Sequence, residues 1–291
     1  MAKEITAGLV FDHLPTRKSE SHKGSYGTLL CVCGCSQYRG AAALAAEGAM
    51  RTGVGLLTLA CVETVIPVVA ARCPEVTYLP CASSAEGGIA QIEGSRILGK
   101  ARGASALLFG PGLGNTPDTA ALLELLGPGA GCPVILDADG LNAAAGLGQL
   151  PRPVDFPLIV TPHPGEMARL CGVTTAEINA NRESFAAGYA RANRCVVVLK
   201  GHYTIVAGPQ GEVFQNTTGN PGLSRGGSGD ILAGMISALV CQGLDPLYAA
   251  VCGVWLHGAA ADRCASRLGQ YGMLPHDILF DLGTIFADNE R

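Results

Sequence analysis

The sequence predicts one α/β domain in which helices cover both faces of a mostly parallel sheet. Short apolar runs alternate with longer segments of helical periodicity, and this alternation is typical of the class. The short runs are apolar at nearly every position, as expected of parallel strands that are buried on both faces. No linker, low-complexity segment or shift in composition interrupts residues 1–291, so we expect a single domain.

The first half of the chain opens with a charged and polar lead-in, residues 1–27, for which we expect irregular structure. A strand at 28–33 then ends in a glycine turn, and an alanine-rich helix follows as far as Arg51. This order is the opening of an α/β unit whose helix lies close on its sheet. Further strands are expected at 55–62, 106–109, 133–136, 158–160 and 195–199.

The second half adds a hairpin and three more helices. Apolar residues at helical spacing predict an amphipathic helix that begins near Asp230, and Gly243 supplies its end. The two arms of the hairpin and its turn are expected at 202–206, 212–215 and 208–211. Two closing helices are expected at 246–267 and 275–286.

The composition argues against several classes of protein. The formal net charge is −4 and no basic block occurs, so nucleic acid is not an expected partner. The N-terminus lacks a signal-peptide pattern and no apolar stretch is long enough for a membrane span, so we expect a cytoplasmic protein without membrane contact. The twelve cysteines lie scattered in apolar segments and are interpreted as buried, reduced side chains, with no metal assigned to protein ligands.

Five turns with ligand-like composition fall where predicted strands end. In open parallel sheets, ligands bind at the carboxyl ends of the strands. The coincidence of five such turns therefore predicts an enzyme. The turns cover residues 36–42, 110–114, 137–142, 161–166 and 216–230.

The last of these turns is interpreted as a phosphoryl-transfer loop. Gly226, Gly227 and Gly229 leave room for a phosphate beside the backbone, and the helix start offers unpaired N–H groups and a positive dipole end. Asp230 stands at this point, where a carboxylate can take a proton from a hydroxyl that attacks phosphorus. A simple N-cap role for Asp230 is the alternative, and the density of glycines favours the first interpretation.

Two other phosphate-binding motifs are not supported. Gly94 to Lys100 has Walker A spacing, but Ala101 replaces the magnesium-binding Ser or Thr and no strand precedes the segment. The turn at 110–114 lacks the spacing of a dinucleotide-binding fingerprint. His163, held between two prolines at a strand end, is left open between a structural and a ligand-facing role.

With these residues together, the chain resembles the ribokinase-like superfamily, whose fold is a three-layer sandwich, and more narrowly the NAD(P)H-hydrate dehydratase family. The resemblance covers essentially the whole chain. Its most specific motifs are Thr-Pro-His-Pro-Gly-Glu at 161–166 and Thr-Gly-Asn-Pro-Gly at 218–222. Arg225 departs from the family pattern by adding a cation beside the anion loop. Further matching segments are 36–42, 110–114, 136–142, 199–201 and 229–230.

The resemblance implies metabolite repair: the S epimer of hydrated NADH or NADPH is dehydrated after its ring hydroxyl takes a phosphoryl group from ADP or ATP with Mg²⁺. Asp230 would be the catalytic base. The hydrated dinucleotide would contact Ala41, Ala42, Gly114, His163 and Asp230. The nucleotide would contact Lys200, Gly201, His202, Tyr203, Thr204, Gly226, Gly227, Ser228 and Gly229. Possible additional site residues are Asp139, Asn142, Glu166 and Asn220.

The resemblance also implies partners. An NAD(P)H-hydrate epimerase would act from a separate chain, and the protein would assemble as a homo-oligomer, with a homotetramer expected. The choice between ADP and ATP stays open. Two alternatives remain: a ribokinase-like kinase for a small vitamin-precursor alcohol, and a silent nucleotide-binding regulator, which the presence of Asp230 disfavours.

Overall fold

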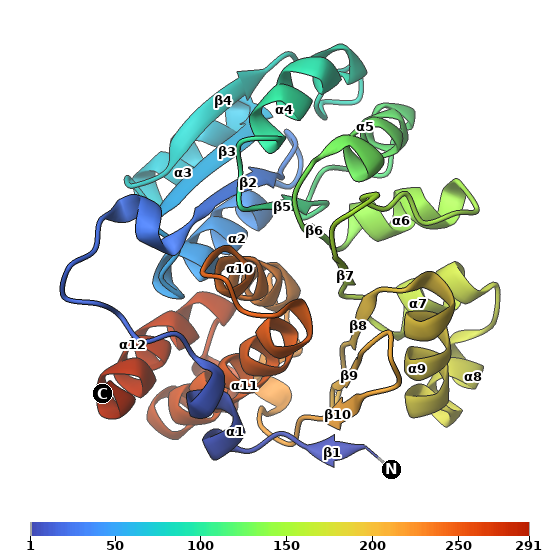
Figure 1. Cartoon of the computed structure of the whole chain (residues 1–291). Helices are drawn as coiled ribbons and strands as arrows, with labels where there is room; N and C mark the ends of the chain where they lie inside the picture. Colours follow the sequence, from blue (N-terminus) through green and yellow to red (C-terminus); the bar gives the residue numbers. More distant parts are fainter. Residues whose placement is uncertain (1, 291) are drawn as a thin grey trace.

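The computed structural model describes residues 2–290, and its strands form one ten-stranded sheet (Figure 1). The strands are β1 (Lys3–Glu4), β2 (Thr28–Val32), β3 (Leu56–Val62), β4 (Thr77–Cys81), β5 (Ala106–Phe109), β6 (Val134–Leu136), β7 (Leu158–Val160), β8 (Val196–Leu199), β9 (Ile205–Ala207) and β10 (Val213–Gln215). Their order is β1-β10-β9-β8-β7-β6-β5-β2-β3-β4. Neighbours from β8 to β4 run parallel, whereas β9 is antiparallel to both β8 and β10.

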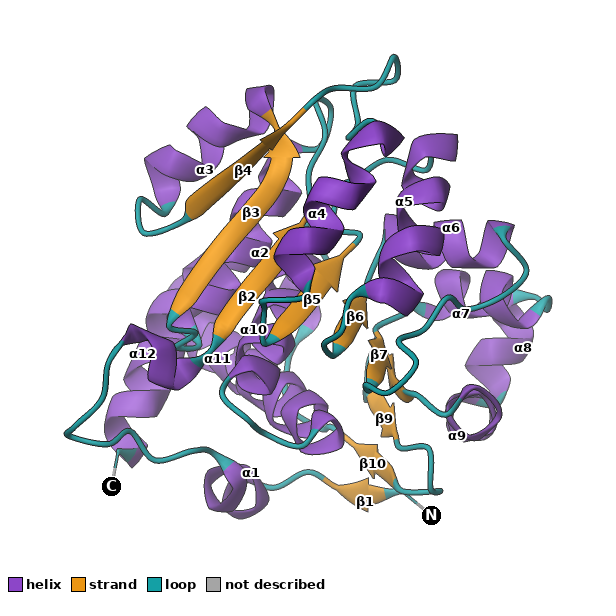
Figure 2. Cartoon of the chain, turned by 45° about the horizontal axis from the view of Figure 1, so that its top comes forward, coloured by secondary structure: helices purple, strands orange, loops and turns teal. Residues whose placement is uncertain are grey.

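Helices cover both faces of this sheet, as predicted. The helices are α1 (Ala7–His13), α2 (Arg39–Arg51), α3 (Ile66–Arg72), α4 (Gly94–Ala101), α5 (Pro117–Gly129), α6 (Asp139–Gly146), α7 (Pro164–Cys171), α8 (Thr175–Ala180), α9 (Arg182–Asn193), α10 (Ser228–Cys241), α11 (Pro246–Gly272) and α12 (Ile278–Asn289). Helices α4 to α9 lie on one face, and α2, α3, α10, α11 and α12 lie on the other (Figure 2). The three-layer α/β prediction is confirmed.

The lead-in is where the fold prediction is wrong. Residues 1–27 were expected to be irregular, but β1 pairs with β10, Thr6 caps α1, and Lys23–Tyr26 form a 3₁₀ turn. Ile5 and Val10 fill the core from this segment. These elements are too short to show a periodic pattern, and only tertiary packing stabilises them.

The hairpin also differs in its first arm. Residues 202–204, expected in a strand, form a turn in which Tyr203 takes a left-handed φ of 57° and the Thr204 hydroxyl donates to the Gly201 carbonyl at 3.0 Å. Strand β9 begins only at Ile205. This turn faces the carboxyl edge of the sheet, where the nucleotide-binding residues were predicted.

Helix α10 is the most deeply buried helix beside that edge, and two glycines let it lie directly on α2. A Cβ on Gly234 would lie 2.1 Å from the carbonyl oxygen of Ala45, and one on Gly48 would lie 2.5 Å from that of Ile231. The helices therefore meet backbone to backbone, and this contact fixes where the N-terminus of α10 points.

All twelve cysteines are free, and all except Cys171 are buried, which confirms their interpretation as small core residues. Burial raises the pKa of several of these thiols, among them Cys61 and Cys195, to about 12, so they stay protonated. Within residues 2–290, no helix combines the length and the apolar character that crossing a membrane requires.

The contact between α2 and α10 predicts an asymmetry between two glycine substitutions. Gly234→Ala should lower the free energy of unfolding by about 1–3 kcal/mol, because its methyl group overpacks against backbone. Gly188→Ala in α9, where nothing lies within 4 Å of the new Cβ, should leave stability unchanged or raise it. Urea unfolding of both variants checks this, and equal stability of Gly234→Ala and wild type would contradict the packing.

Candidate functional site

A pocket of about 640 Å³ opens at the carboxyl edge of β6, β7 and β8, beneath the N-terminus of α10. The turn at 201–204 and residues 216–229 form its rim, and α11 forms part of its wall. It brings together most of the predicted site residues. Those that line it are His163, Lys200, Gly201, His202, Tyr203, Thr204, Asn220, Gly226, Gly227, Ser228, Gly229 and Asp230.

The remaining predicted residues lie outside this lining. Asp139 accepts a hydrogen bond from the Gly114 backbone at 2.8 Å and one from Asn142 at 3.3 Å, so these three form an adjoining cluster at the ends of β5 and β6. The two candidate alanines separate. Ala42 is fully buried beside Gly34, whereas Ala41 is half-buried beside Gly112, so only Ala41 is open to contact with a ligand.

The glycine-rich loop that was predicted to bind phosphate has the backbone geometry that its glycines favour. Gly227 is the N-cap of α10 with a φ of 98°, and a Cβ there would lie 2.4 Å from Leu44 of α2. The N-cap is a glycine without a side-chain acceptor. The Ser228 N–H donates to the Arg225 carbonyl at 3.4 Å, and the next N–H groups of the first turn, those of Gly229 and Asp230, are left to solvent or a ligand. The loop therefore presents an anion site at the positive end of a buried helix.

Asp230 lies in the first turn of α10 and is not its N-cap, so the alternative interpretation is wrong. Burial raises the pKa of its carboxyl to about 7, and the charge of Asp137 acts in the same direction, while Lys200 opposes both. A carboxyl with this pKa can both take and release a proton near neutral pH.

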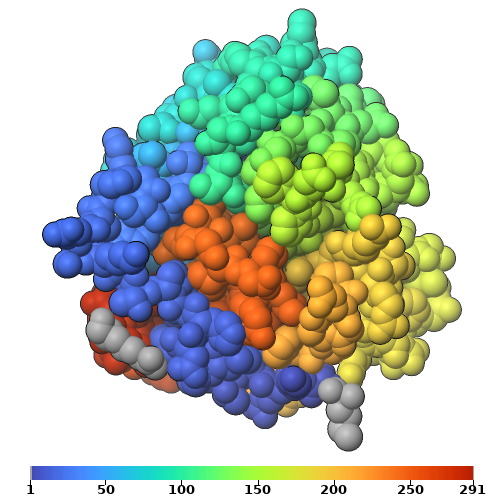
Figure 3. All heavy atoms as spheres, viewed as in Figure 1, coloured from blue at the N-terminus to red at the C-terminus, as the bar shows by residue number. Residues whose placement is uncertain are grey.

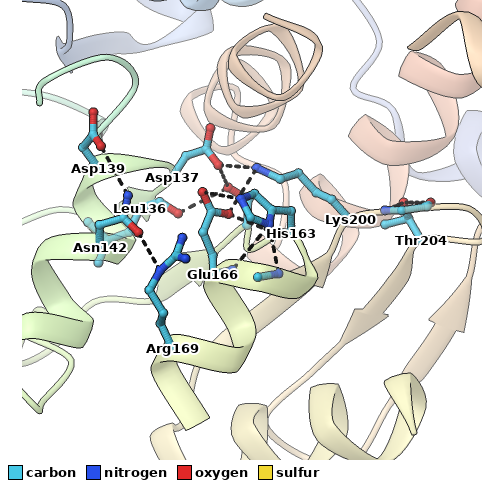
Figure 4. Close-up of polar contacts among 12 residues, drawn as sticks. Leu136, Asp137, Asp139, Asn142, His163, Glu166, Arg169, Lys200 and Thr204 are labelled. Carbon is cyan, nitrogen blue, oxygen red and sulfur yellow. Dashed lines mark hydrogen bonds and ion pairs between the residues drawn. The ribbon is translucent and has the colours of Figure 1, made fainter. Parts of the chain in front are cut away.

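Asp137 is a central residue of the site that the sequence prediction did not assign to it. It ends β6, is 1 % exposed, and its Oδ1 accepts hydrogen bonds from the Lys200 ammonium at 2.6 Å and the Thr161 hydroxyl at 2.7 Å (Figure 4). Glu166 lies 3.9 Å from the same ammonium, and burial raises the pKa of Glu166 to about 7. The only sequence signal for Asp137 was its position directly after the buried strand β6.

His163 is both structural and turned toward the pocket. Its Nδ1 accepts from the backbone N–H groups of Gly165 at 3.0 Å and Glu166 at 3.4 Å, which caps α7. In return the Glu166 carboxylate accepts from the His163 N–H at 2.7 Å. Burial and the nearby cations Lys200 and Arg169 lower the pKa of His163. The ring is thus neutral, with its proton on Nε2 as a donor.

Helix α11 anchors the rim of the pocket. Asp262 accepts from the Gly219 backbone at 2.8 Å and from the Asn220 side chain at 2.9 Å, so this asparagine is held within the protein. His257 lies 3.5 Å from the Ser228 hydroxyl, and burial lowers its pKa to about 4. Neither α11 residue was predicted, although both are polar residues in a helix whose first half is mostly small and apolar.

Arg225, the residue that departs from the family pattern, reaches away from the anion loop. Its guanidinium donates to the Tyr271 carbonyl at 2.7 Å, at the end of α11. This contact fastens the exposed part of the loop to the helix.

A second pocket of about the same volume lies at the opposite end of α10, between α1, α2 and α12. None of the predicted site residues lines it. In Figure 3 the N-terminal segment (dark blue) and α12 (red) lie side by side on the molecular surface near the C-terminal end of α10. The chemistry predicted from the sequence is therefore concentrated in the pocket at the carboxyl edge.

Comparison with known proteins agrees with this geometry. The family model for NAD(P)H-hydrate dehydratase matches residues 29–282. A bifunctional NAD(P)H-hydrate repair enzyme from Moorella thermoacetica is 40% identical over 99% of this chain, which spans only 54% of that protein. The chain thus spans about half the length of such bifunctional relatives.

Shorter relatives match over most of their length. The ADP-dependent (S)-NAD(P)H-hydrate dehydratase of Bacillus subtilis is 38% identical over 91% of both chains. The crystal structure of the ADP/ATP-dependent NAD(P)H-hydrate dehydratase from Bacillus subtilis, co-crystallised with ATP/Mg²⁺, superposes with a TM-score of 0.86 and 36% identity over 99% of each chain. A hydroxyethylthiazole kinase from Pyrococcus horikoshii, 15% identical with a TM-score of 0.56 over 90% of this chain and 88% of its own, shares the fold alone. The chain belongs to the NAD(P)H-hydrate dehydratase family.

Proposed function

We propose that this protein dehydrates the S epimer of hydrated NADH or NADPH, using ADP or ATP as phosphoryl donor, and so returns the dihydronicotinamide. The observation that carries the proposal is the buried Asp230 carboxyl, with a pKa of about 7, at the anion-binding start of α10. Family membership supplies the substrate class, and the Bacillus subtilis relative is by name ADP-dependent and specific for the S form.

Asp230 takes the proton of the ring hydroxyl as the hydroxyl oxygen attacks the terminal phosphorus of the donor. The bond from that phosphorus to the donor's bridging oxygen breaks, and AMP leaves when the donor is ADP. The first-turn N–H groups of α10 and the Lys200 ammonium face the charge that develops on the transferred group. The carbon–oxygen bond of the ring then breaks, the neighbouring ring carbon releases a proton to solvent and its C–H electron pair forms the ring double bond, and inorganic phosphate carries the oxygen away.

Magnesium fits this site as an ion carried by the nucleotide. In the part of the chain that the structure describes, no group of three or more His, Cys, Asp or Glu side chains could hold a metal ion. Mg²⁺ keeps several waters and binds phosphate oxygens in nucleotide sites, so it needs no protein cage. When bound, it would neutralise charge on the phosphates.

The two substrates occupy different parts of the carboxyl edge. Lys200 to Thr204 and residues 226–229 bind the nucleotide, since they surround the anion loop. Ala41, Gly114 and His163 bind the hydrated dinucleotide on the other side of Asp230, next to the cluster of Asp139 and Asn142. Asn220 and Glu166 shape the site through Asp262 and His163.

The cellular setting is part of the same proposal. Residues 1–291 act as one dehydratase domain, which the single sheet supports, and an epimerase on another chain supplies the S form. The twelve free cysteines support a reducing, cytoplasmic environment. Exposed apolar side chains near the end of α11 support a homo-oligomer, for which we propose a homotetramer. These side chains are Leu268, Tyr271, Leu274 and Phe280.

The first test follows the return of dihydronicotinamide absorbance from hydrated NADH with ADP, ATP or neither. We expect recovery only with a nucleotide, together with stoichiometric phosphate. Protein that binds nucleotide but restores no absorbance would contradict the proposal and direct the search to small-alcohol kinase substrates.

The second test is Asp230→Asn. Removing the general base should lower turnover by about 10²–10⁴-fold and leave ADP affinity nearly unchanged. In the wild type, turnover should rise as pH increases through about 7, since the raised pKa keeps Asp230 protonated below that pH.

Asp288→Asn is the matched control, because Asp288 pairs with Arg263 at 2.5 Å on the far surface of α11 and α12. It should retain wild-type turnover and pH dependence. Calorimetric ADP binding over the same pH range separates titration of the nucleotide from that of Asp230. Full activity in Asp230→Asn would remove this residue from the mechanism.

A further inference from the structure

The Lys200 side chain crosses the carboxyl edge of the sheet to reach the anion loop. It starts at the end of β8, where its backbone N–H donates to Pro162 at 2.8 Å, and its ammonium ends 3.2 Å from where a Cβ on Gly229 would lie. The ammonium pairs with Asp137 and lies 3.9 Å from Glu166, whereas the rest of the nucleotide contacts that the resemblance implies on this side lie in the turn at 201–204. The charge of Lys200 therefore lies at the phosphate end of the site.

Asp137 holds the ammonium there. Its Oδ1 accepts from Lys200 at 2.6 Å and from Thr161 at 2.7 Å, and its own backbone N–H is bound to Phe109 at 3.2 Å. In Figure 4 the Asp137 carboxylate and the Lys200 ammonium point toward one another from the ends of β6 and β8, the two strands that flank β7. The carboxylate is 1 % exposed, so this direction is fixed by packing.

The charges around the ammonium show why such a tether matters. Asp137, Glu166 and Asp230 all raise the pKa of Lys200, which more than offsets the lowering by burial, so the ammonium stays charged. Three acidic groups thus compete for one cation. Without Asp137, the cation could move toward Glu166, 3.9 Å away, or toward Asp230.

We propose that Asp137 is a positioning residue for phosphoryl transfer, which holds the Lys200 ammonium against the terminal phosphate of the donor nucleotide. The role rests on the proposed function. While the ring hydroxyl bonds to the terminal phosphorus and its proton passes to Asp230, the fixed ammonium neutralises charge on the transferred oxygens. Asp137 acts through Lys200.

A double-mutant cycle tests this dependence. Asp137→Asn should lower kcat by about 100-fold with little change in the KM for ADP, as expected when an interaction made in the transition state is lost. Asp137→Asn combined with Lys200→Gln should be no slower than Lys200→Gln alone. If the loss of kcat in the double variant equals the product of the losses in the two single variants, the proposal is overturned. If Asp137→Asn does not fold, the double variant still does the test, since it leaves no unpaired buried charge.

The pH profile gives a readout that a merely structural role would not move. The charge of Asp137 raises the pKa of Asp230, and that of Lys200 lowers it. In Asp137→Asn the negative charge of Asp137 is lost and the Lys200 ammonium is free to approach Asp230. Both changes lower the pKa of Asp230, so the acid limb of the pH profile should move to lower pH. The matched control is Asp281→Asn, which breaks a half-buried 2.8 Å pair with Arg267 away from the site. It should lower stability without moving the pH profile.

Nucleotide binding tests the position of Lys200 without turnover. By calorimetry, Lys200→Gln should weaken ADP binding by about tenfold and AMP binding by less than twofold, because only ADP carries the terminal phosphate. Equal losses for ADP and AMP would place Lys200 at the adenylate and overturn the proposal. If the wild-type protein forms no NADH from hydrated NADH, the proposed function fails. The ADP and AMP affinities of the Lys200→Gln variant still show where the ammonium lies.

Discussion

The site depends on the placement of the positive N-terminal end of helix α10 at the carboxyl edge of the sheet, where several carboxylates gather. The N-terminus of α10 attracts anions, while Asp137, Asp139, Glu166 and Asp230 stand around it and repel them. The Lys200 ammonium, held by Asp137, offsets part of this repulsion. A phosphate can enter because the helix dipole and one fixed cation act together. Asp230 keeps a raised pKa because it is buried and because the other carboxylates, Asp137 first among them, surround it.

The scaffold sets this geometry before any substrate arrives. Helix α10 cannot slide, because Gly48 and Gly234 bring its backbone against that of α2. The loops that meet it are tied by their own side chains: the His163 and Glu166 pair closes the start of α7, and Asp262 fastens the rim to α11. Fixed donors and charges of this kind stabilise a transition state without reorganising during the reaction.

Much of this could be predicted from local sequence, and the remainder could not, for physical reasons. Buried parallel strands and glycine-rich strand ends have local signatures, so strands β2, β3 and β5 to β8 and the place of Asp230 at the start of α10 were predicted, whereas β1 and β4 were not. The contact of Asp137 with Lys200 joins residues 63 positions apart, and no local pattern contains it. Likewise Ala41 and Ala42 look alike in sequence, and only the packing of α2 on Gly34 buries the second.

The claim that the dehydration is phosphoryl transfer followed by elimination is tested most directly with an isotope label. Hydrated NADH carrying ¹⁸O in its ring hydroxyl is converted with ADP, and the label is located by mass spectrometry. The account predicts the label in inorganic phosphate, since the ring oxygen bonds to phosphorus before the carbon–oxygen bond breaks. Label released into water would show direct dehydration and contradict the mechanism.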